Sequence, residues 1–398
     1  MSRDFMAPGL AVKVGDSLVG EDITSAVISA EFEHTTDMVS KVTITLDNRG
    51  MRFSDAQVFQ PGNEVSLYMG YGPELAHIGR GEIIRHRPNF PREEAPVLTI
   101  VGYDRSFRMM REEMEIKGGG GEAPEKKKDE SGRLWKGTLK ECVTALFSKY
   151  GIKPVVEESI ASIQVKFTQK KGTSDYKVLR ALANLYGCET HTEWNDETKE
   201  WEGHFRAAIN GKSNQSEFYT FRYAQGEAST LLEIDLDYSI SETVTEVQAW
   251  VWDRGANGGE GDWLPLVEEE KEKGKKEKFS AGTFGDTAFP GGQVDPLQFP
   301  TRLKLSASGH AVEILTRRFR DPVEAQIYVK LWLNAYKDSF VEATGTVIGI
   351  ETLRAGQVHV LEGLGARFSG EYYWSMARHS WKSSEGYEVE FTARKVVE

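Results

Sequence analysis

The sequence predicts a mainly β protein with an α+β insertion, in which two related small antiparallel β-barrel domains flank a middle α+β domain. Three observations support this fold class. Apolar and polar residues alternate with the period of a strand near both ends, helical periodicity dominates the middle, and one order of turn glycines and strands occurs twice. The 398 residues, 39% of them hydrophobic and 28% charged, are enough for about two to four domains.

The opening segment, about residues 5–112, is expected to form the first barrel. Its strand-like stretches are rich in β-branched residues, and Gly, Pro and Asn separate them at the spacing of a meander or small barrel. These stretches are 26–33, 41–46, 64–69, 81–86 and 96–101. Between Lys117 and Arg133 no apolar side chain is larger than proline, so residues 113–133 are assigned to a flexible charged linker or surface loop.

Residues 134–229 are expected to form the middle α+β domain. Apolar residues recur at helical spacing from Leu139 to Tyr150, where Thr138 can cap the start and Gly151 can end the helix. A second helix is expected between a cap at Thr173 or Ser174 and a terminator at Gly187, with short strands at 155–156 and 164–167.

A hairpin is expected around residues 195–200. In its simplest register Trp194 faces Trp201 and His191 faces His204, which places the tryptophans on one side of the ribbon and the histidines on the other.

Residues 230–398 are assigned to the second barrel. Strand patterns at 231–240 and 243–252 precede a long loop, 254–300, which contains a balanced charge run. A helix at 321–339 is expected because residues 321–324 supply a cap, a first-turn proline and an acid. Strands from 342 to 397 end the sequence.

An internal repeat links the two ends. A turn glycine, a strand and a Gly-Glu pair that opens a second strand occur in the same order in each, with Gly62 matching Gly356 and Gly81–Glu82 matching Gly370–Glu371. The alternative is that any two antiparallel meanders look alike. If the repeat is real, three chains closed head to tail would present six similar barrels, and such a ring could join a six-fold partner to a three-fold one.

Composition excludes several classes. With 61 acidic and 49 basic residues the formal charge is −12, so the electrostatic footprint of a nucleic-acid-binding protein is missing. An acidic lumen would keep a passing polyanion from sticking, although acidic residues also simply aid solubility. Two cysteines cannot build a disulfide framework, and we expect neither a membrane-spanning helix nor a secretory leader.

The candidate catalytic and metal-ligating residues are few. Cys188, His191 and His204 could form a partial metal site on the hairpin, and Glu193 with Glu202 a carboxylate pair for sugar cleavage. We favour the simpler interpretation, in which all of these are exposed strand residues. No nucleophile elbow or zinc-protease motif occurs. The sequence therefore predicts no catalytic, cofactor or metal site and no enzyme.

A second interpretation is a secreted carbohydrate-binding or carbohydrate-active β protein. The 9 Trp and 14 Tyr favour it, and His379 between Trp374 and Trp381 could belong to an aromatic sugar-binding face. The missing signal segment speaks against it.

The order of motifs resembles the phage late control protein D family, the baseplate hub proteins of contractile tails, which are related to the front part of type VI secretion valine-glycine repeat spike proteins. The resemblance covers nearly the whole chain. It rests on Phe59–Leu67, Gly79–Ile83, Gly102–Arg105, Leu185–Gly187, Leu353–Val358, Phe368–Tyr373, His379 and Gly386–Tyr387.

The resemblance implies a homotrimeric hub whose two barrels per subunit form a pseudo-hexameric ring. One face would meet the hexameric tail tube and the other the trimeric spike, with other baseplate proteins as further partners, and DNA or cargo would pass through the lumen without specific binding. It also implies a virion location in the tail baseplate, assembly in the host cytoplasm, and a structural role for His379. The chain stops at Glu398 without a spike segment, so the spike is expected to be a separate polypeptide.

Overall fold

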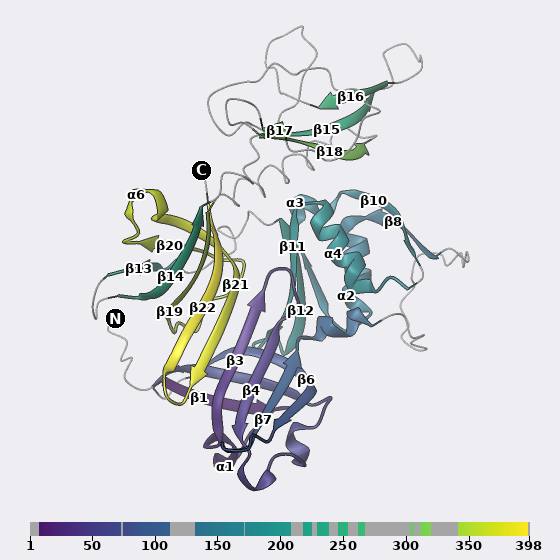
Figure 1. The fold of residues 1–398 in the computed structure, drawn as a ribbon. Helices are drawn as coiled ribbons and strands as arrows, with labels where there is room; N and C mark the ends of the chain where they lie inside the picture. The colour runs from purple at the N-terminus through teal and green to yellow at the C-terminus, as the bar shows by residue number, and fades with distance from the viewer. Residues whose placement is uncertain are drawn as a thin grey trace.

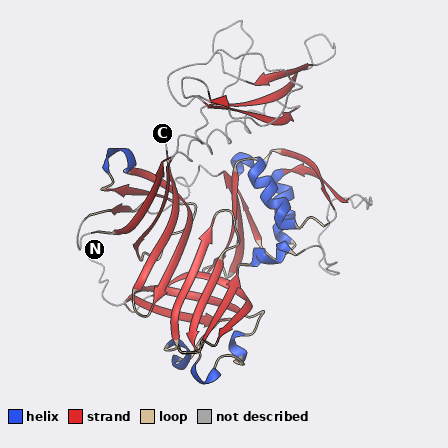
Figure 2. Cartoon of the chain, in the orientation of Figure 1, coloured by secondary structure: helices blue, strands red, loops and turns tan. Residues whose placement is uncertain are grey.

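The computed structural model describes most of the chain, and it is built mainly from strands (Figures 1 and 2). The described residues are 8–72, 75–111, 132–170, 172–207, 218–224, 229–238, 246–253, 262–266, 304–305, 311–319 and 341–396. The main feature is a 13-stranded sheet that contains strands from both ends of the sequence. None of the described helices is long and apolar enough to span a membrane.

The opening segment supplies the first half of this sheet. Its strands are β1 (Pro8–Val14), β2 (Ser17–Leu18), β3 (Val27–Thr35), β4 (Lys41–Asp47), β5 (Glu64–Tyr71), β6 (Ala76–Asn89) and β7 (Val97–Tyr103). Its helices are short: α1 (Glu21–Thr24) and the 3-10 turns η1 (Arg49–Met51), η2 (Gln57–Phe59) and η3 (Arg105–Met110). The five strands expected in this segment are confirmed, and β6 is longer than its sequence pattern indicates.

The closing segment supplies the second half. Its strands are β13 (Thr220–Arg222), β14 (Leu231–Tyr238), β19 (Val341–Ile348), β20 (Val358–Glu362), β21 (Gly370–Lys382) and β22 (Gly386–Lys395), with α6 (Gly365–Phe368) between β20 and β21. Alternating burial along β22 matches the period-two pattern that predicts a half-buried strand.

The two halves share one strand order. The pairing runs β3-β4-β7-β6-β5-β1 in the first half and β14-β19-β22-β21-β20-β13 in the second, and equivalent strands follow the same order along the chain. Bulges recur at equivalent places, between Ile83 and Arg85 in β6 and between Trp374 and Met376 in β21. One difference is that β1 runs antiparallel to β5, whereas β13 runs parallel to β20.

The pairing register defines which residues of the two halves are equivalent. Gly62 and Gly356 both adopt positive φ, and their N–H groups donate to Ile83 and Trp374, so these two pairs correspond as the sequence predicts. The predicted match of Gly81 with Gly370 is wrong by two residues, because the bulges align Gly79 with Gly370. Glycine pairs are common in turns, and their order alone does not determine the register.

The middle segment packs two longer helices against small sheets (Figure 2). Its elements are β8 (Gly132–Thr138), α2 (Leu139–Ser148), β9 (Lys153–Val156), α3 (Glu158–Ala161), β10 (Gln164–Lys170), α4 (Asp175–Leu185), β11 (Cys188–Asn195) and β12 (Glu200–Ala207). Thr138 caps α2 in a capping box and Ser174 caps α4, as expected. The expected linker ends too late, because residues 132–133 already belong to β8, which pairs with β10.

A separate four-stranded sheet contains β15 (Glu246–Asp253), β16 (Asp262–Leu266), β17 (Lys304–Leu305) and β18 (Ala311–Phe319). Strand β16 interrupts the stretch 254–300, which the sequence predicts to be loop throughout. Most of that stretch, most of the linker 113–133 and the predicted helix 321–339 lie outside the described residues.

Among the described residues, the apolar core has two parts. One cluster fills the middle segment, and the other is continuous between the opening and closing halves of the large sheet. A shared core fits one sheet that runs through both halves, so the division into two separate barrels stays a prediction.

Candidate functional site

The two halves of the sheet meet at an antiparallel seam between β3 and β21. Residues 376–382 of β21 pair with residues 35–29 of β3. Arg378 reaches across this seam to the Glu33 carboxylate at 2.7 Å and also contacts Glu390 on β22 at 2.8 Å. The seam is therefore held by a backbone ladder and by one arginine between two carboxylates.

Strand β6 is the equivalent of β21 in the first half, and the edge that would correspond to the seam has no described strand beside it. Strand β5 pairs with β6 only as far as Glu82, and the backbone of Ile83 bonds to residues 62 and 63. From Arg85 to Asn89, β6 pairs with β7 on one side, and no described strand pairs with the other. The outer edge of β14, equivalent to the β3 side of the seam, also has no described strand beside it.

These two open edges carry opposite charges. Arg85 and Arg87 are exposed on β6, whereas Glu233, Asp235 and Asp237 are exposed on β14. Large apolar residues accompany them: Phe90, just past β6, is 55% exposed, and Leu232 on β14 is 42% exposed. Exposed apolar residues beside unpaired strand edges are typical of a surface that another chain covers.

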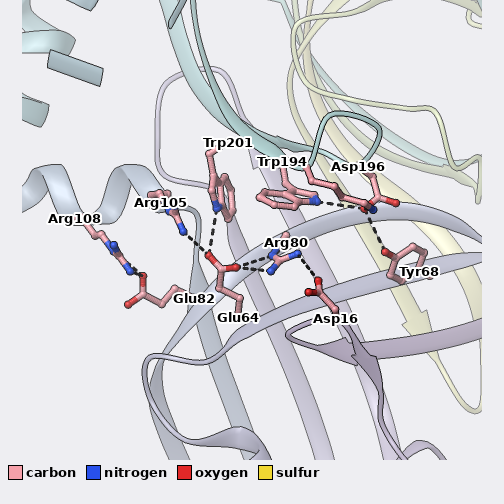
Figure 3. A network of polar contacts seen from close by, with 11 residues as sticks. Asp16, Glu64, Tyr68, Arg80, Glu82, Arg105, Arg108, Trp194, Asp196 and Trp201 are labelled. Carbon is pink, nitrogen blue, oxygen red and sulfur yellow. Dashed lines mark hydrogen bonds and ion pairs between the residues drawn. The ribbon is translucent and has the colours of Figure 1, made fainter. Parts of the chain in front are cut away.

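A polar network joins the first half of the sheet to the hairpin of the middle segment (Figure 3). The Glu64 carboxylate accepts hydrogen bonds from Arg80 at 2.9 Å, from Arg105 at 2.8 Å and from the Trp201 indole at 3.3 Å. Burial alone would raise the pKa of Glu64, but the two guanidinium groups outweigh it and the pKa is lowered. A charged Glu64 therefore ties η3 and β12 to β5.

The hairpin tip extends this network. The Arg80 guanidinium lies 4.1 Å from the centre of the Trp194 ring, and the Trp194 indole donates to Asp196 at 3.2 Å (Figure 3). Asp196 also accepts from Lys199 at 2.8 Å and from Tyr68 of β5 at 3.5 Å. The middle segment is thus held against the first half of the sheet by several charged and aromatic contacts.

The predicted hairpin register is confirmed. His191 lies opposite His204 with stacked rings 4.8 Å apart, and Trp194 lies opposite Trp201. The interpretation of these residues as exposed is wrong for His191, which is 6% exposed, and for Cys188, which is 8% exposed. Cys188 belongs to the apolar core of the middle segment, so it does not complete a site with the histidines.

His34 of β3, His191 and Glu193 form a cluster whose potential ligand atoms lie within 4.8 Å of one another. The backbone N–H of Ala355 donates to Nδ1 of His34 at 3.1 Å, so the proton of the neutral ring belongs on Nε2, the nitrogen that has no partner. Burial lowers the pKa of His34 to about 4, which keeps the ring neutral. A protonated Nε2 cannot bind a cation, and the contacts fit packed neutral histidines better than a metal centre.

The two residues of the candidate carboxylate pair have different partners. Glu193 and Glu202 lie opposite each other, but Glu193 contacts the ring of His204 at 3.0 Å and Glu202 contacts Lys153. Each carboxylate thus has a structural partner of its own.

The aromatic sugar-binding face is also wrong, because Trp374 and His379 are fully buried. Trp374 stacks on Phe391 at 4.4 Å, and His379 contacts the Tyr387 hydroxyl at 2.6 Å and the Leu353 carbonyl. Neither side chain can meet a ligand. The structural role that the resemblance implies for His379 agrees with these contacts.

Sequence reasoning missed the open edges and the Glu64 network. Arg85 and Arg87 stand in an exposed basic stretch and Glu233, Asp235 and Asp237 alternate along β14, so the charge pattern was visible in the sequence. Their relation to the seam depends on register, which the sequence does not define.

No known family model matches this sequence, and no curated protein is similar to it in sequence. Solved structures are similar to it in fold. They include the tail protein from Neisseria meningitidis MC58, with a TM-score of 0.59 and 10% identity over 98% of this chain and 96% of that one. The 43 kDa tail protein of prophage MuSo2 from Shewanella oneidensis gives 0.57 and 10%, over 98% of each chain.

A third similar structure is the E. coli c3393 protein, with a TM-score of 0.53 and 11% identity over 97% of this chain and 77% of that one. It is described as a component of the type VI secretion system that is structurally similar to the T4 bacteriophage tail proteins gp27 and gp5. At these identities the comparisons show the fold. The chain therefore has the fold of these phage tail proteins and of this type VI secretion component, in agreement with the fold that the resemblance implies.

Proposed function

We propose that this protein is a structural, non-enzymatic hub of a contractile tail, a homotrimer that joins a six-fold tail tube to a three-fold central spike. The observation that carries the proposal is the repeated strand order within one chain, in a fold shared with tail proteins. Two matched halves per chain give six matched units in a trimer, so one ring fits partners of both symmetries.

The domain division follows from the same proposal. Residues 5–112 and 230–398 would each form a barrel of the ring, with residues 134–229 as the middle unit and 113–133 as the linker. The Glu64 network supports a fixed position of the middle unit, because it ties the hairpin to the first half of the sheet (Figure 3).

The partners follow from the symmetry of the ring. A hexameric tube would contact six similar surfaces, and a trimeric spike would contact one middle unit from each chain. These interfaces would each bury more than about 2,000 Å², since force passes through them during contraction. The working location would be the tail baseplate of a virion, after assembly in the host cytoplasm.

The test is the mass of the assembled species. Native mass spectrometry and light scattering of the full chain, alone and mixed with the tail tube and spike proteins of the same particle, should show three copies per particle. A chain that stays monomeric with both partners present would contradict the proposal.

A further inference from the structure

Strands β3 and β21 pair inside the chain, and the equivalent edges of β14 and β6 have no described strand beside them. We propose that residues 85–89 of β6 pair with the outer edge of β14 in a second copy of this chain, in the register that β21 and β3 use within one chain. The inference rests on the proposed function, because it names the contact that would close the ring.

The register follows from the equivalence of the two halves. The bulges of β6 and β21 align Arg87 with Arg378, and the pairing of β14 with β19 aligns Asp237 with Glu33. Since Arg378 lies directly opposite Glu33 at the seam, Arg87 would lie directly opposite Asp237 between two copies. The arginine-carboxylate pair of the internal seam thus has a counterpart of the same charges.

The charges of the open edges are complementary beyond this pair. Within the described residues, Arg85 and Arg87 form no ion pair, and neither do Asp235 and Asp237. Two exposed arginines would meet a strand that carries alternating carboxylates, which favours this edge of β14 over a second copy of β6.

The apolar residues also correspond. Phe90 takes the place of Trp381, which packs against the shared core and lies opposite Ala30 at the seam. The place of Ala30 on β14 belongs to Ile234. Phe90, which is 55% exposed in the single chain, would therefore be buried against Ile234 of the second copy.

Pro88 interrupts the regular pattern of backbone hydrogen bonds that this pairing would otherwise form. It takes the place of His379, and it has no N–H to donate to a neighbouring strand. A proline at an edge also prevents indiscriminate strand pairing. The contact would then depend on the charged pair more than the internal seam does, which supports a specific partner.

The geometry suits a ring. Strands β14 and β6 lie on opposite sides of the seam in Figure 1, so the contact is head to tail rather than two-fold. Such contacts form a closed ring when the rotation between neighbours closes.

The experiment is a disulfide trap in the full chain. Directly opposite residues on paired strands are close enough for a disulfide, so Arg87→Cys with Asp237→Cys should link neighbouring copies under mild oxidation. The native thiols do not interfere, because Cys142 and Cys188 are buried and burial raises the pKa of Cys142 to about 12. Arg85→Cys with Asp237→Cys, two residues out of register, is the matched control and should link at least tenfold more slowly.

Charge exchange gives a second measurement. Arg87→Asp and Asp237→Arg should each weaken self-association at least tenfold, and the double exchange should restore it, while Lys166→Glu, on an exposed face of β10, should change nothing. This inference is overturned if a trimer forms but the control cysteine pair cross-links as fast as the Arg87→Cys and Asp237→Cys pair. It is also overturned if neither charge variant weakens self-association. Both results would leave the hub proposal standing. A monomer under all conditions overturns both.

Discussion

The opening and closing halves of the large sheet have the same strand order, and they differ in how they fill it. Ile44 lies opposite Ile100 in the first half, whereas Gly345 lies opposite Phe391 at the equivalent place in the second. A Cβ on Gly345 would come within 2.9 Å of the Phe391 ring. The absence of a side chain at Gly345 therefore makes room for the large ring opposite it. A fold is thus preserved by the summed volume and the strand register, while individual side chains exchange sizes.

The largest expected effect concerns the residue whose carbonyl accepts the hydrogen bond of the turn glycine in each half. Trp374 is fully buried against Phe391 and Phe221, and Ile83 occupies its place in the first half. Trp374→Ala should lower the free energy of unfolding by about 4 kcal/mol, and Ile83→Val by only about 1 kcal/mol. Denaturant unfolding measures both, and equal losses would show that the two cores are not packed differently.

A smaller loss is expected at the hairpin junction. Glu64 corresponds to Val358, so only the first half offers a carboxylate to the middle segment. Glu64→Ala leaves Arg80 and Arg105 without their shared partner and should lower stability by about 3 kcal/mol. Glu82→Ala, which removes a more exposed ion pair with Arg108, is the control and should lower stability by less than about 1 kcal/mol.

A pH-dependent difference is expected where His359 replaces Val65. Burial lowers the pKa of His359 to about 3, so between pH 6.5 and 3 the unfolded chain binds more protons than the folded one. The free energy of unfolding is therefore unaffected by His359 above pH 6.5 and falls as the pH is lowered, by about 2 kcal/mol at pH 5. Thermal unfolding of His359→Val should therefore vary less with pH over this range, and an unchanged pH profile would contradict the assignment.

The smallest change in the stability of the dissociated chain is expected at Arg378 and at Arg87, which occupy equivalent positions in the two halves. Arg378→Ala removes the contacts with Glu33 and Glu390 at a partly exposed seam, and should lower stability by about 1 kcal/mol. Arg87→Ala should leave the unfolding of the dissociated chain unchanged within about 0.5 kcal/mol, because no described partner is lost. A similar loss for both variants would mean that Arg87 already has an internal role.

Much of this fold could be predicted from the sequence, since strands such as β4 and β22 alternate regularly and α2 and α4 have clear caps. The hairpin register was also predictable, because a short loop restricts how two strands pair. The seam was not, because residues 345 positions apart meet there and no local pattern encodes such a contact. Burial of His191 was hidden for the same reason, since His34 covers it from a distant strand.

Ser375 in β21 and Ile84 in β6 are extra residues that have no partner of their own on the neighbouring strand. Trp374 lies opposite Ala393 and Met376 lies opposite Thr392, so the side chains on both sides of Ser375 keep the alternation of a regular strand. Deleting either extra residue would therefore leave the same side chains facing the core and would remove the local bend and added twist of the bulge. A one-residue deletion could thus redirect the outer part of each strand without changing which side chains it buries.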